Sequence, residues 1–309
     1  MTAAPFQAGD VSVAIPTYER GVVLLETLRA LLPQGPGEIL VLDQTAAHPA
    51  DVQAALEDLK CDGRIRWEHL PRPAIPPAMN AGLLRATRSL VLFLDDDIVP
   101  APGLVAAHAA AYEDEATWAV AGQVLQPGEQ PVTGQVARRA GFRADLDFLF
   151  RSSERTFVAN GMAGNLSVRR ERALAVGGFD ENFEGVAYRF ETEFCRRLCR
   201  AGGRILFEPA ASIRHLRAPR GGTRTLGTHL TSASPDFGVG DYYFALREPG
   251  SLARWAYVAR RPLREVMTRF HLRHPWWIPV KLCGELRALA RGLTLASGQR
   301  RLVGGKEAR

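Results

Sequence analysis

The sequence contains no apolar run that approaches the roughly 18 to 20 residues a membrane-spanning helix needs. Its beginning lacks the basic, apolar and small-residue order of a secretory signal peptide. Cysteine is scarce, with 4 among 309 residues, and only Cys195 and Cys199 lie near each other, one helical turn apart. This scarcity argues against a disulfide framework and against a zinc knuckle. We therefore expect reduced thiols and a cytoplasmic protein, either free or at the inner face of a membrane.

Two common nucleotide-binding motifs are also missing. No Gly-x-Gly-x-x-Gly follows the first apolar run, which argues against a dinucleotide-dependent dehydrogenase. No Gly-x-x-x-x-Gly-Lys-Ser/Thr indicates a P-loop. What is present is a chain of 46% apolar and 23% charged residues, which can bury a full core in one large domain or two small ones.

Positive charge is concentrated at the end of the chain. Residues 247–309 contain 14 Lys and Arg against 4 Asp and Glu, so this segment has a net charge of +10. Since the whole chain has a net charge of +6, residues 1–246 have a net charge of −4. We therefore expect a mildly acidic main domain over residues 1–246, followed by a basic helical extension over residues 247–309.

Short apolar runs alternate with segments of helical spacing along the first hundred residues. Strands are predicted at residues 11–16, 38–43, 64–70 and 89–94, and helices at residues 21–34, 48–60 and 78–87. Such an alternation predicts an α/β fold, in which a mostly parallel, Rossmann-like sheet has helices on both faces.

The fourth predicted strand ends in three consecutive carboxylates, Asp95, Asp96 and Asp97. Ligands of open α/β sheets bind beyond the carboxyl ends of the strands, where Thr17 and Asp43 also fall. Neighbouring carboxylates repel one another unless a cation or hydrogen-bond donors compensate them, and oxygen ligands favour Mg²⁺ or Mn²⁺. The alternative is a solvated acidic turn, with Asp97 near the start of the next helix.

Four segments, taken together, are more specific than any one of them. They are VSVAIPTYER, VLDQT, PPAMNAGLLRATRSLVLFLDDDIVP and GNLSVRRERALAVGGFDENF. In order and spacing they resemble the signatures of family 2 glycosyltransferases of the GT-A fold, over about residues 10–220. The resemblance implies a nucleotide-binding half at about residues 10–100 and an acceptor half at about residues 101–220. It also implies a metal-dependent, inverting transfer of a sugar from a nucleotide-diphosphate sugar to an acceptor hydroxyl.

The resemblance further implies roles for single residues. The residues implied to bind the donor are Pro16, Thr17, Tyr18, Glu19, Asp43, Asn80, Asp95 and Asp96. Asp97 and His215 are implied to bind Mn²⁺ or Mg²⁺, although a lone histidine is more often a satisfied surface or core residue. Met79 stands where the family has an arginine beside Asn80, so one donor contact differs from the family pattern.

The resemblance places the catalytic base in the segment YRFETEFCRRLCRAGGRILFEPAASIRH, residues 188–215. Glu191 stands in place of the family's aspartate and is the expected base. Glu193 is the second choice, and its alternative role is an i,i+4 ion pair with Arg197 on a helix. The next segment, residues 215–225, either closes over the diphosphate through its arginines or forms an exposed linker.

The basic extension mixes Trp, Tyr and Leu with regularly spaced Arg. Residues 251–295 have the character of a membrane-surface element, which fits an acceptor carried on a lipid. The alternative is a helical cover for the main domain, broken into short pieces by Pro262, Pro275 and Pro279.

Two other function classes stay open at this point. A metal-dependent nucleotidyltransferase would share the carboxylates and the nucleotide pocket. A non-catalytic basic binding module is suggested by the basic charge with aromatic residues nearby. A nucleic-acid partner is not expected, because a phosphate backbone avoids clustered carboxylates unless metals intervene.

Overall fold

The computed structural model describes residues 6–133, 141–250 and 252–305, and a nine-stranded sheet lies at the centre of these residues. The strands are β1 (Val11–Thr17), β2 (Glu38–Asp43), β3 (Arg66–His69), β4 (Leu90–Leu94), β5 (Ile98–Pro100), β6 (Thr117–Leu125), β7 (Thr156–Val158), β8 (Asn165–Arg169) and β9 (Arg204–His215). Their order is β3-β2-β1-β4-β8-β6-β9-β5, and β7 pairs with β9 beside this path.

The first four strands are parallel, as the alternation of strands and helices predicts. Thr17 lies opposite Asp43, which lies opposite His69, so the carboxyl ends of three strands meet at one edge of the sheet. The strand β8 runs antiparallel to both β4 and β6. The mostly parallel α/β sheet is therefore confirmed. Its antiparallel insertion was not predicted, because an apolar run does not reveal the direction of its strand.

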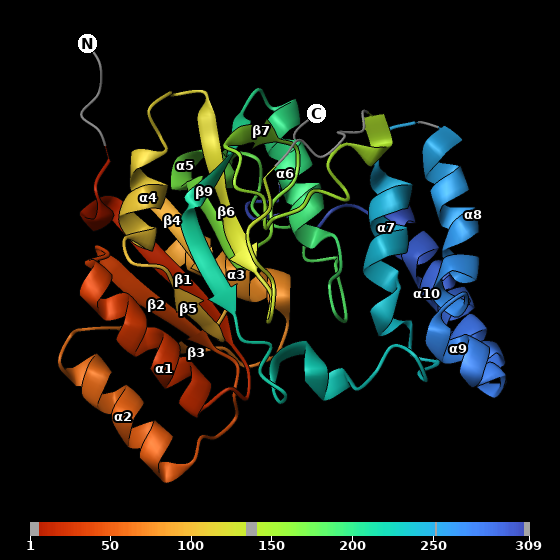
Figure 1. Cartoon of the computed structure of the whole chain (residues 1–309), viewed down its shortest axis with the longest axis horizontal. Helices are drawn as coiled ribbons and strands as arrows, with labels where there is room; N and C mark the ends of the chain where they lie inside the picture. Colours follow the sequence, from red (N-terminus) through yellow and green to blue (C-terminus); the bar gives the residue numbers. More distant parts are fainter. Residues whose placement is uncertain (1–5, 134–140, 251, 306–309) are drawn as a thin grey trace.

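Alternate side chains of each central strand enter two apolar cores, one on either face. On β4, Leu90, Leu92 and Leu94 face one core, and Val91 and Phe93 face the other. The first core is covered by α1 (Val22–Leu31), α2 (Ala50–Cys61) and α4 (Leu104–Ala110). The second is covered by α3 (Ile75–Arg85), α5 (Arg170–Ala175) and α6 (Phe190–Arg200). Helices on both faces are thus confirmed (Figure 1).

The helix α3 begins three residues before its predicted start at residue 78, because Pro76 and Pro77 lie in its first turn, where proline is tolerated. Gly82 brings this helix close to the sheet, since a Cβ there would lie 3.0 Å from the Cβ of Ala14. The remaining local elements are the 3₁₀ turns η1 (Ala8–Asp10), η2 (Leu32–Gln34), η3 (Gly141–Arg143), η4 (Gly222–Leu226), η5 (Pro235–Phe237) and η6 (Pro275–Trp277). All four cysteines are unpaired, as expected.

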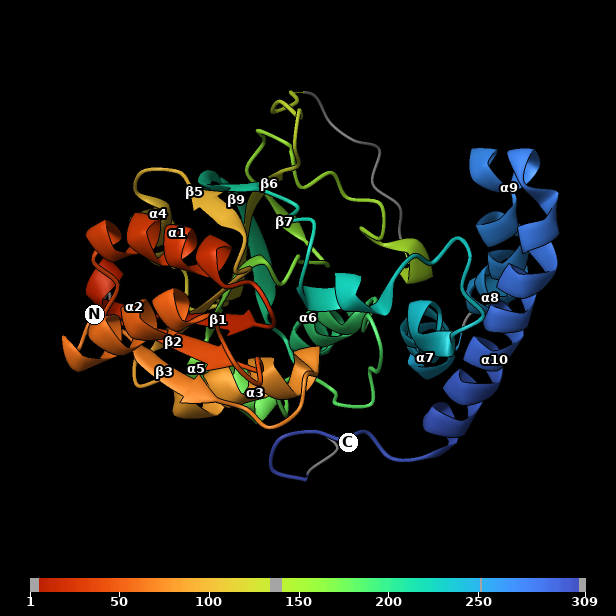
Figure 2. The ribbon, with the colours of Figure 1, turned by 90° about the horizontal axis from the view of Figure 1, so that it is seen from below.

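A layer of helices stands beside the main body (Figures 1 and 2). It consists of α7 (Val239–Arg247), α8 (Leu252–Val266), α9 (Arg269–Arg273) and α10 (Ile278–Ser297), and α7 packs against both α8 and α10. The predicted break at Pro262 is wrong, because α8 continues through it and is anchored by buried Tyr257, Val258 and Arg261. The described helices include none that combines the length and the apolar character required to cross a bilayer.

The chain leaves α10 and returns beneath the main body (Figure 2). The Val303 amide donates to the carbonyl of Gly177, and the Arg301 amide donates to the carboxylate of Asp180. Asp180 also accepts hydrogen bonds from the amide of Asn182 and the hydroxyl of Tyr243. Residues 298–305 therefore tie the helical layer to the turn that precedes α6.

Candidate functional site

A cleft of about 920 Å³ opens where the carboxyl ends of β1 and β4 approach the start of α6. It collects most of the residues that the sequence predicts for the site. Those that line it are Pro16, Thr17, Tyr18, Asp95, Asp96, Asp97, Glu191 and His215. Segments more than 170 residues apart in the chain, from Thr17 to Glu191, therefore contribute to one cavity.

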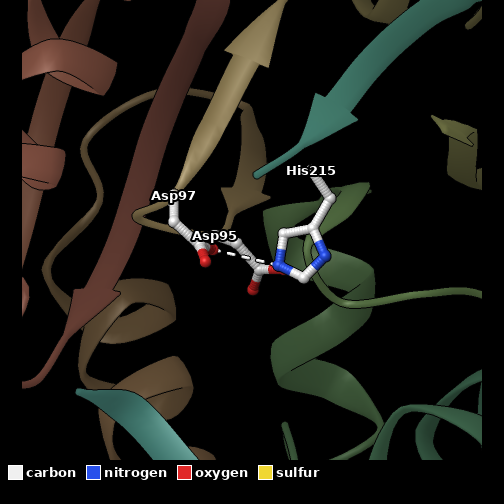
Figure 3. A group of neighbouring side chains, drawn as sticks. All are labelled: Asp95, Asp97 and His215. Carbon is white, nitrogen blue, oxygen red and sulfur yellow. Dashed lines mark hydrogen bonds and ion pairs between the residues drawn. The ribbon is translucent and has the colours of Figure 1, made fainter. Parts of the chain in front are cut away.

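Asp95, Asp97 and His215 form a compact group within this cleft (Figure 3). Each offers one ligand atom, and these atoms all lie within 4.8 Å of one another. The Nε2 atom of His215 is 3.0 Å from Oδ1 of Asp97 and 3.8 Å from Oδ2 of Asp95. The family resemblance implies only Asp97 and His215 as metal ligands, whereas the structure places Asp95 in the same group.

The pairing of β5 with β9 creates this group. Ile98 lies opposite His215 in the antiparallel ladder, so Asp97 falls beside the histidine. The Leu216 amide donates a hydrogen bond to the carbonyl of Asp97, and the Ala218 amide donates one to Oδ2 of Asp97, both at 2.8 Å. Asp97 is 1% exposed and is separated from α4 by β5, so the alternative of a solvated helix-capping turn is wrong.

Arg20 compensates two of the three aspartates and was not predicted. Its Nε lies 3.2 Å from Oδ1 of Asp96, and its Nη1 lies 3.4 Å from Oδ2 of Asp97. Nη1 also donates to the carbonyls of Ala218 and Arg220, which holds the guanidinium in place. Arg20 directly follows the PTYE segment. The signal for its role in the sequence is the need for a cation near the three adjacent aspartates.

The three aspartates differ in their affinity for protons. Burial raises the pKa of Asp96 to about 7, although the charge of Arg20 opposes this change. Burial acts in the same direction on Asp97, but the hydrogen bond with His215 and the charges of His215 and Arg20 hold the pKa of Asp97 below its usual value. The hydrogen bond with Asp97 in turn raises the pKa of His215. Asp97 is thus the aspartate whose ionised form the surroundings favour most clearly.

The donor set of this group fits a divalent cation. Nδ1 of His215 lies 3.1 Å from Oε1 of Gln126, so when Nδ1 donates to that amide, Nε2 turns its lone pair toward the carboxylates. Two carboxylates and one imidazole nitrogen suit a cation of the Mn²⁺ type, whereas Mg²⁺ is usually bound through oxygen alone. Gln126 was also absent from the sequence predictions, because its role depends on a contact across 89 residues.

Glu191 lies in the first turn of α6 and lines the cleft. Burial raises the pKa of Glu191 to about 7; Arg189 opposes this rise and Asp95 adds to it. Glu193, the second choice, is 1% exposed and forms the expected i,i+4 ion pair, with its two oxygens 2.7 and 2.9 Å from Nε of Arg197. Because Glu193 does not line the cleft, the geometry favours Glu191 as the group that acts there.

The segment of residues 215–225 packs against the end of β1. The Gly222 amide donates a hydrogen bond to the carbonyl of Tyr18. Gly221 has a φ of 77°, and a Cβ at this position would lie only 2.4 Å from the carbonyl oxygen of Glu19, so glycine is required here. Arg224, on η4, lines the cleft, as does Arg72. Most side chains of the segment are nevertheless exposed, so the structure shows an exposed loop whose residues 222–225 line the cleft. Closure over a diphosphate stays a prediction.

Three predicted donor-binding residues lie outside the lining of the cleft: Glu19, Asp43 and Asn80. The carboxylate of Asp43 is occupied by the side chains of His48 and Trp67 and the amide of Thr45. Glu19 is exposed to solvent.

Asn80 is also committed within the protein. Its amide group exchanges two hydrogen bonds with the backbone of Phe179, at 2.9 and 2.8 Å, and donates to Glu181. This geometry does not support a donor contact for Asn80. The neighbours Gln44 and Met79 line the cleft instead of Asp43 and Asn80.

Comparison with known proteins gives a consistent result. Residues 12–176, just over half of the chain, match the family model described as glycosyl transferase family 2. The pre-mycofactocin glycosyltransferase of Mycobacterium tuberculosis, in two strains, is 29% identical over 213 residues, which are 67% of this chain and 42% of that protein. The chain thus spans less than half the length of these curated relatives.

Two solved structures have a similar fold. A crystal structure of GalNAc-T7 with UDP, GalNAc and Mn²⁺ has a TM-score of 0.54 at 16% identity, and covers 68% of this chain and 44% of its own. The mannosyltransferase PcManGT from Pyrobaculum calidifontis, in complex with GDP-Man and Mn²⁺, has a TM-score of 0.54 at 18% identity, and covers 96% of this chain and 84% of its own. The expected GT-A-like α/β fold with a C-terminal helical extension is confirmed.

Proposed function

Because this chain belongs to glycosyl transferase family 2, we propose that it transfers a sugar from a nucleotide-diphosphate sugar to an acceptor hydroxyl, with a divalent cation and with inversion. One observation carries the proposal: a single cleft holds both the group of Asp95, Asp97 and His215 and a carboxylate, Glu191, with a raised pKa. Nucleotides or nucleotide sugars together with Mn²⁺ are present in the solved structures of similar fold, which supports this assignment.

The donor is proposed to bind at the carboxyl end of β1. Pro16, Thr17 and Tyr18 line this end of the cleft and would contact the nucleotide. Arg224 would offer a planar fork of donors to the diphosphate, since guanidinium groups match phosphate oxygens in pairs. The hydrogen bond from the Gly222 amide to the carbonyl of Tyr18 holds the loop that bears Arg224 beside the end of β1.

Asp95, Asp97 and His215 are proposed to hold the cation, with Gln126 orienting the imidazole. When bound, a dication such as Mn²⁺ supplies positive charge that offsets the negative charge developing on the departing diphosphate. Arg20 neutralises Asp96 and fixes the neighbouring carboxylate of Asp97 from the protein side.

Glu191 is proposed as the general base. Its carboxylate would accept the proton of the acceptor hydroxyl while the oxygen forms a bond to the anomeric carbon, and the bond from that carbon to the diphosphate oxygen breaks. Attack from the face opposite the leaving group inverts the anomeric centre. A carboxylate with a pKa of about 7 suits this task, because a base is most effective when its pKa lies near the working pH.

A product assay tests this proposal against its alternatives. The protein is incubated with Mn²⁺ and separate nucleotide sugars, and the released phosphates are identified. Release of nucleoside diphosphate supports glycosyl transfer, and release of pyrophosphate supports a nucleotidyltransferase. Release of neither, with any donor, supports a non-catalytic binding module and refutes the proposal.

We also propose that the basic helical extension contacts an anionic membrane surface at which the acceptor is carried. Residues 252–297 contain nine Lys and Arg against two Asp and Glu. Their exposed apolar side chains are Leu252, Trp255, Leu263, Met267, Leu272, Trp276, Leu286 and Leu293. Apolar side chains among basic ones are typical of surfaces that bind anionic lipid. Sedimentation with anionic but not with neutral vesicles is the expected result, and sedimentation with neither contradicts the proposal.

A further inference from the structure

A second cavity, of about 340 Å³, lies between the main body and α8. Its lining consists of Arg143, Leu146, Asp147, Arg189, Tyr257, Arg260, Arg261 and Arg264. Five of these eight residues are arginines, and we name this cavity the arginine pocket. So many guanidinium groups around one small cavity repel one another unless negative charge lies among them.

Part of this positive charge is already neutralised. Arg261 pairs with the buried carboxylates of Asp241 and Glu285, and Arg264 pairs with Asp241 and Glu265. These three carboxylates pair with two of the five arginines, and a fourth carboxylate, Asp147, lies in the lining itself and has an interaction partner of its own.

Two arginines of the pocket have no carboxylate partner. Arg143 on η3 and Arg260 on α8 form no ion pair within the part of the chain that the structure describes. They come from opposite sides of the pocket, one from the main body and one from the extension. An anion between them would be contacted from both sides.

Arg189 connects this pocket to the proposed catalytic site. It is 8% exposed, and its Nε has no hydrogen-bond partner, because the nearest carboxylate oxygen, on Asp241, lies 3.6 Å away. Its backbone is left-handed, with a φ of 76°, as is that of Ala187, with a φ of 52°. Non-glycine residues are rarely held in this region, and such strain is concentrated at functional sites.

The strained turn and the first residues of α6 contribute side chains to both cavities. Arg189 lines the arginine pocket, whereas Glu191, two residues later, lines the main cleft. Gly240 lets α7 approach this turn, since a Cβ there would lie 2.5 Å from the carbonyl oxygen of Tyr188. A molecule held in the arginine pocket would therefore lie across one turn of chain from the proposed base.

We propose that the arginine pocket binds a phosphate group carried by the acceptor and thereby brings the acceptor hydroxyl to Glu191. This inference rests on the proposed glycosyl transfer. Phosphate is the favoured ligand because arginine forks match its oxygens in pairs, and the volume lies at the lower end of the ~300 to 1,000 Å³ of small-molecule sites. Two other arginines, Arg72 and Arg224, line the main cleft and would serve the donor diphosphate there.

The experiment titrates inorganic phosphate into the full chain by calorimetry, with nucleoside diphosphate and Mn²⁺ already saturating the main cleft, and with sodium chloride at matched ionic strength as the reference. We expect phosphate to bind the wild-type chain. We expect Arg143→Gln and Arg260→Gln each to weaken that binding by about tenfold or more, since each removes a charge-assisted contact. Arg273→Gln is the matched control, because it removes an exposed arginine of the same helical layer outside the pocket.

Thermal unfolding of each variant separates lost binding from lost folding. Equal phosphate affinity in the wild-type chain and the two pocket variants overturns the inference, as does an Arg273→Gln variant that loses as much affinity as they do. Failure of nucleoside diphosphate to bind concerns the proposed function instead, and the phosphate titration is then repeated on the chain alone.

Vesicles distinguish the two sources of the phosphate. Phosphatidylcholine vesicles containing phosphatidic acid, which carries a phosphate monoester, are compared with phosphatidylcholine alone. Sedimentation that requires Arg143 and Arg260 supports a lipid-borne acceptor. Binding of free phosphate without such sedimentation supports a soluble acceptor.

Discussion

The proposed base predicts a pH dependence that an ordinary glutamate would not produce. Burial raises the pKa of Glu191 from 4.5 to about 7, and a base must be ionised to accept a proton. With a pKa of about 7, about 9% of the carboxylate is ionised at pH 6 and about 91% at pH 8. The rate of the chemical step should therefore rise about tenfold between these values and level off above them.

The assay follows nucleoside diphosphate release at saturating donor and Mn²⁺ from pH 5 to pH 9. Two causes raise the pKa of Glu191: burial and, to a smaller extent, the negative charge of Asp95. A bound cation would offset the charge of Asp95, so burial would then be the remaining cause of the raised pKa. Glu191→Gln should lower turnover about 10²- to 10⁴-fold and abolish the slope, because an amide cannot take the proton. Glu184→Gln is the control, since Glu184 also lines the cleft but pairs with Arg291, and it should keep the wild-type profile.

Three outcomes would contradict the role of Glu191 as a base with a raised pKa. A rate that is flat from pH 6 to pH 8 contradicts a base with a pKa of about 7. Turnover of Glu191→Gln at the wild-type rate contradicts any role of this carboxylate as the base. Loss of the slope in Glu184→Gln would place the titrating group elsewhere in the cleft.

Three further changes test other parts of the structure. Asp97→Asn should weaken the Mn²⁺-dependent binding of nucleoside diphosphate, and unchanged affinity by calorimetry contradicts its proposed role. Gly164→Ala should weaken Mn²⁺ binding about tenfold or more, because the added Cβ would lie 2.1 Å from Oδ2 of Asp95 and displace that carboxylate. Gly9→Ala is the control, because a Cβ at residue 9 would have no other atom within 4 Å. Burial lowers the pKa of His108 from 6.5 to about 4, so its contribution to the free energy of unfolding, up to about 3 kcal/mol, is present above pH 6.5 and is lost as the pH falls toward 4. Urea unfolding should show this loss in the wild-type chain and a smaller one in His108→Gln, and equal losses in both would contradict it.

Some contacts of the site follow from local pattern. The alternation of strands and helices predicts parallel strands, and the carboxyl ends of parallel strands meet at one edge of a sheet. Thr17 and the aspartates after β4 therefore fall into one cleft, as expected. The i,i+4 pair of Glu193 and Arg197 follows from helical spacing alone.

Other contacts depend on pairings between distant segments. Asp97 meets His215 across 118 residues because β5 pairs with β9, and Arg20 reaches Asp96 and Asp97 through a loop held at Ala218. No local periodicity specifies either pairing.

The sequence by itself determined the α/β class, the position of the aspartates at a strand end and the family resemblance, because each depends on residues that are near one another in the chain. Only the tertiary structure decided which carboxylates share a ligand group and which, like Asp43, are occupied within the protein. It also decided that α8 continues through Pro262 and that five arginines surround one cavity. The physical reason is that hydrogen bonds, charge and burial act between neighbours in space, which the chain brings together only on folding.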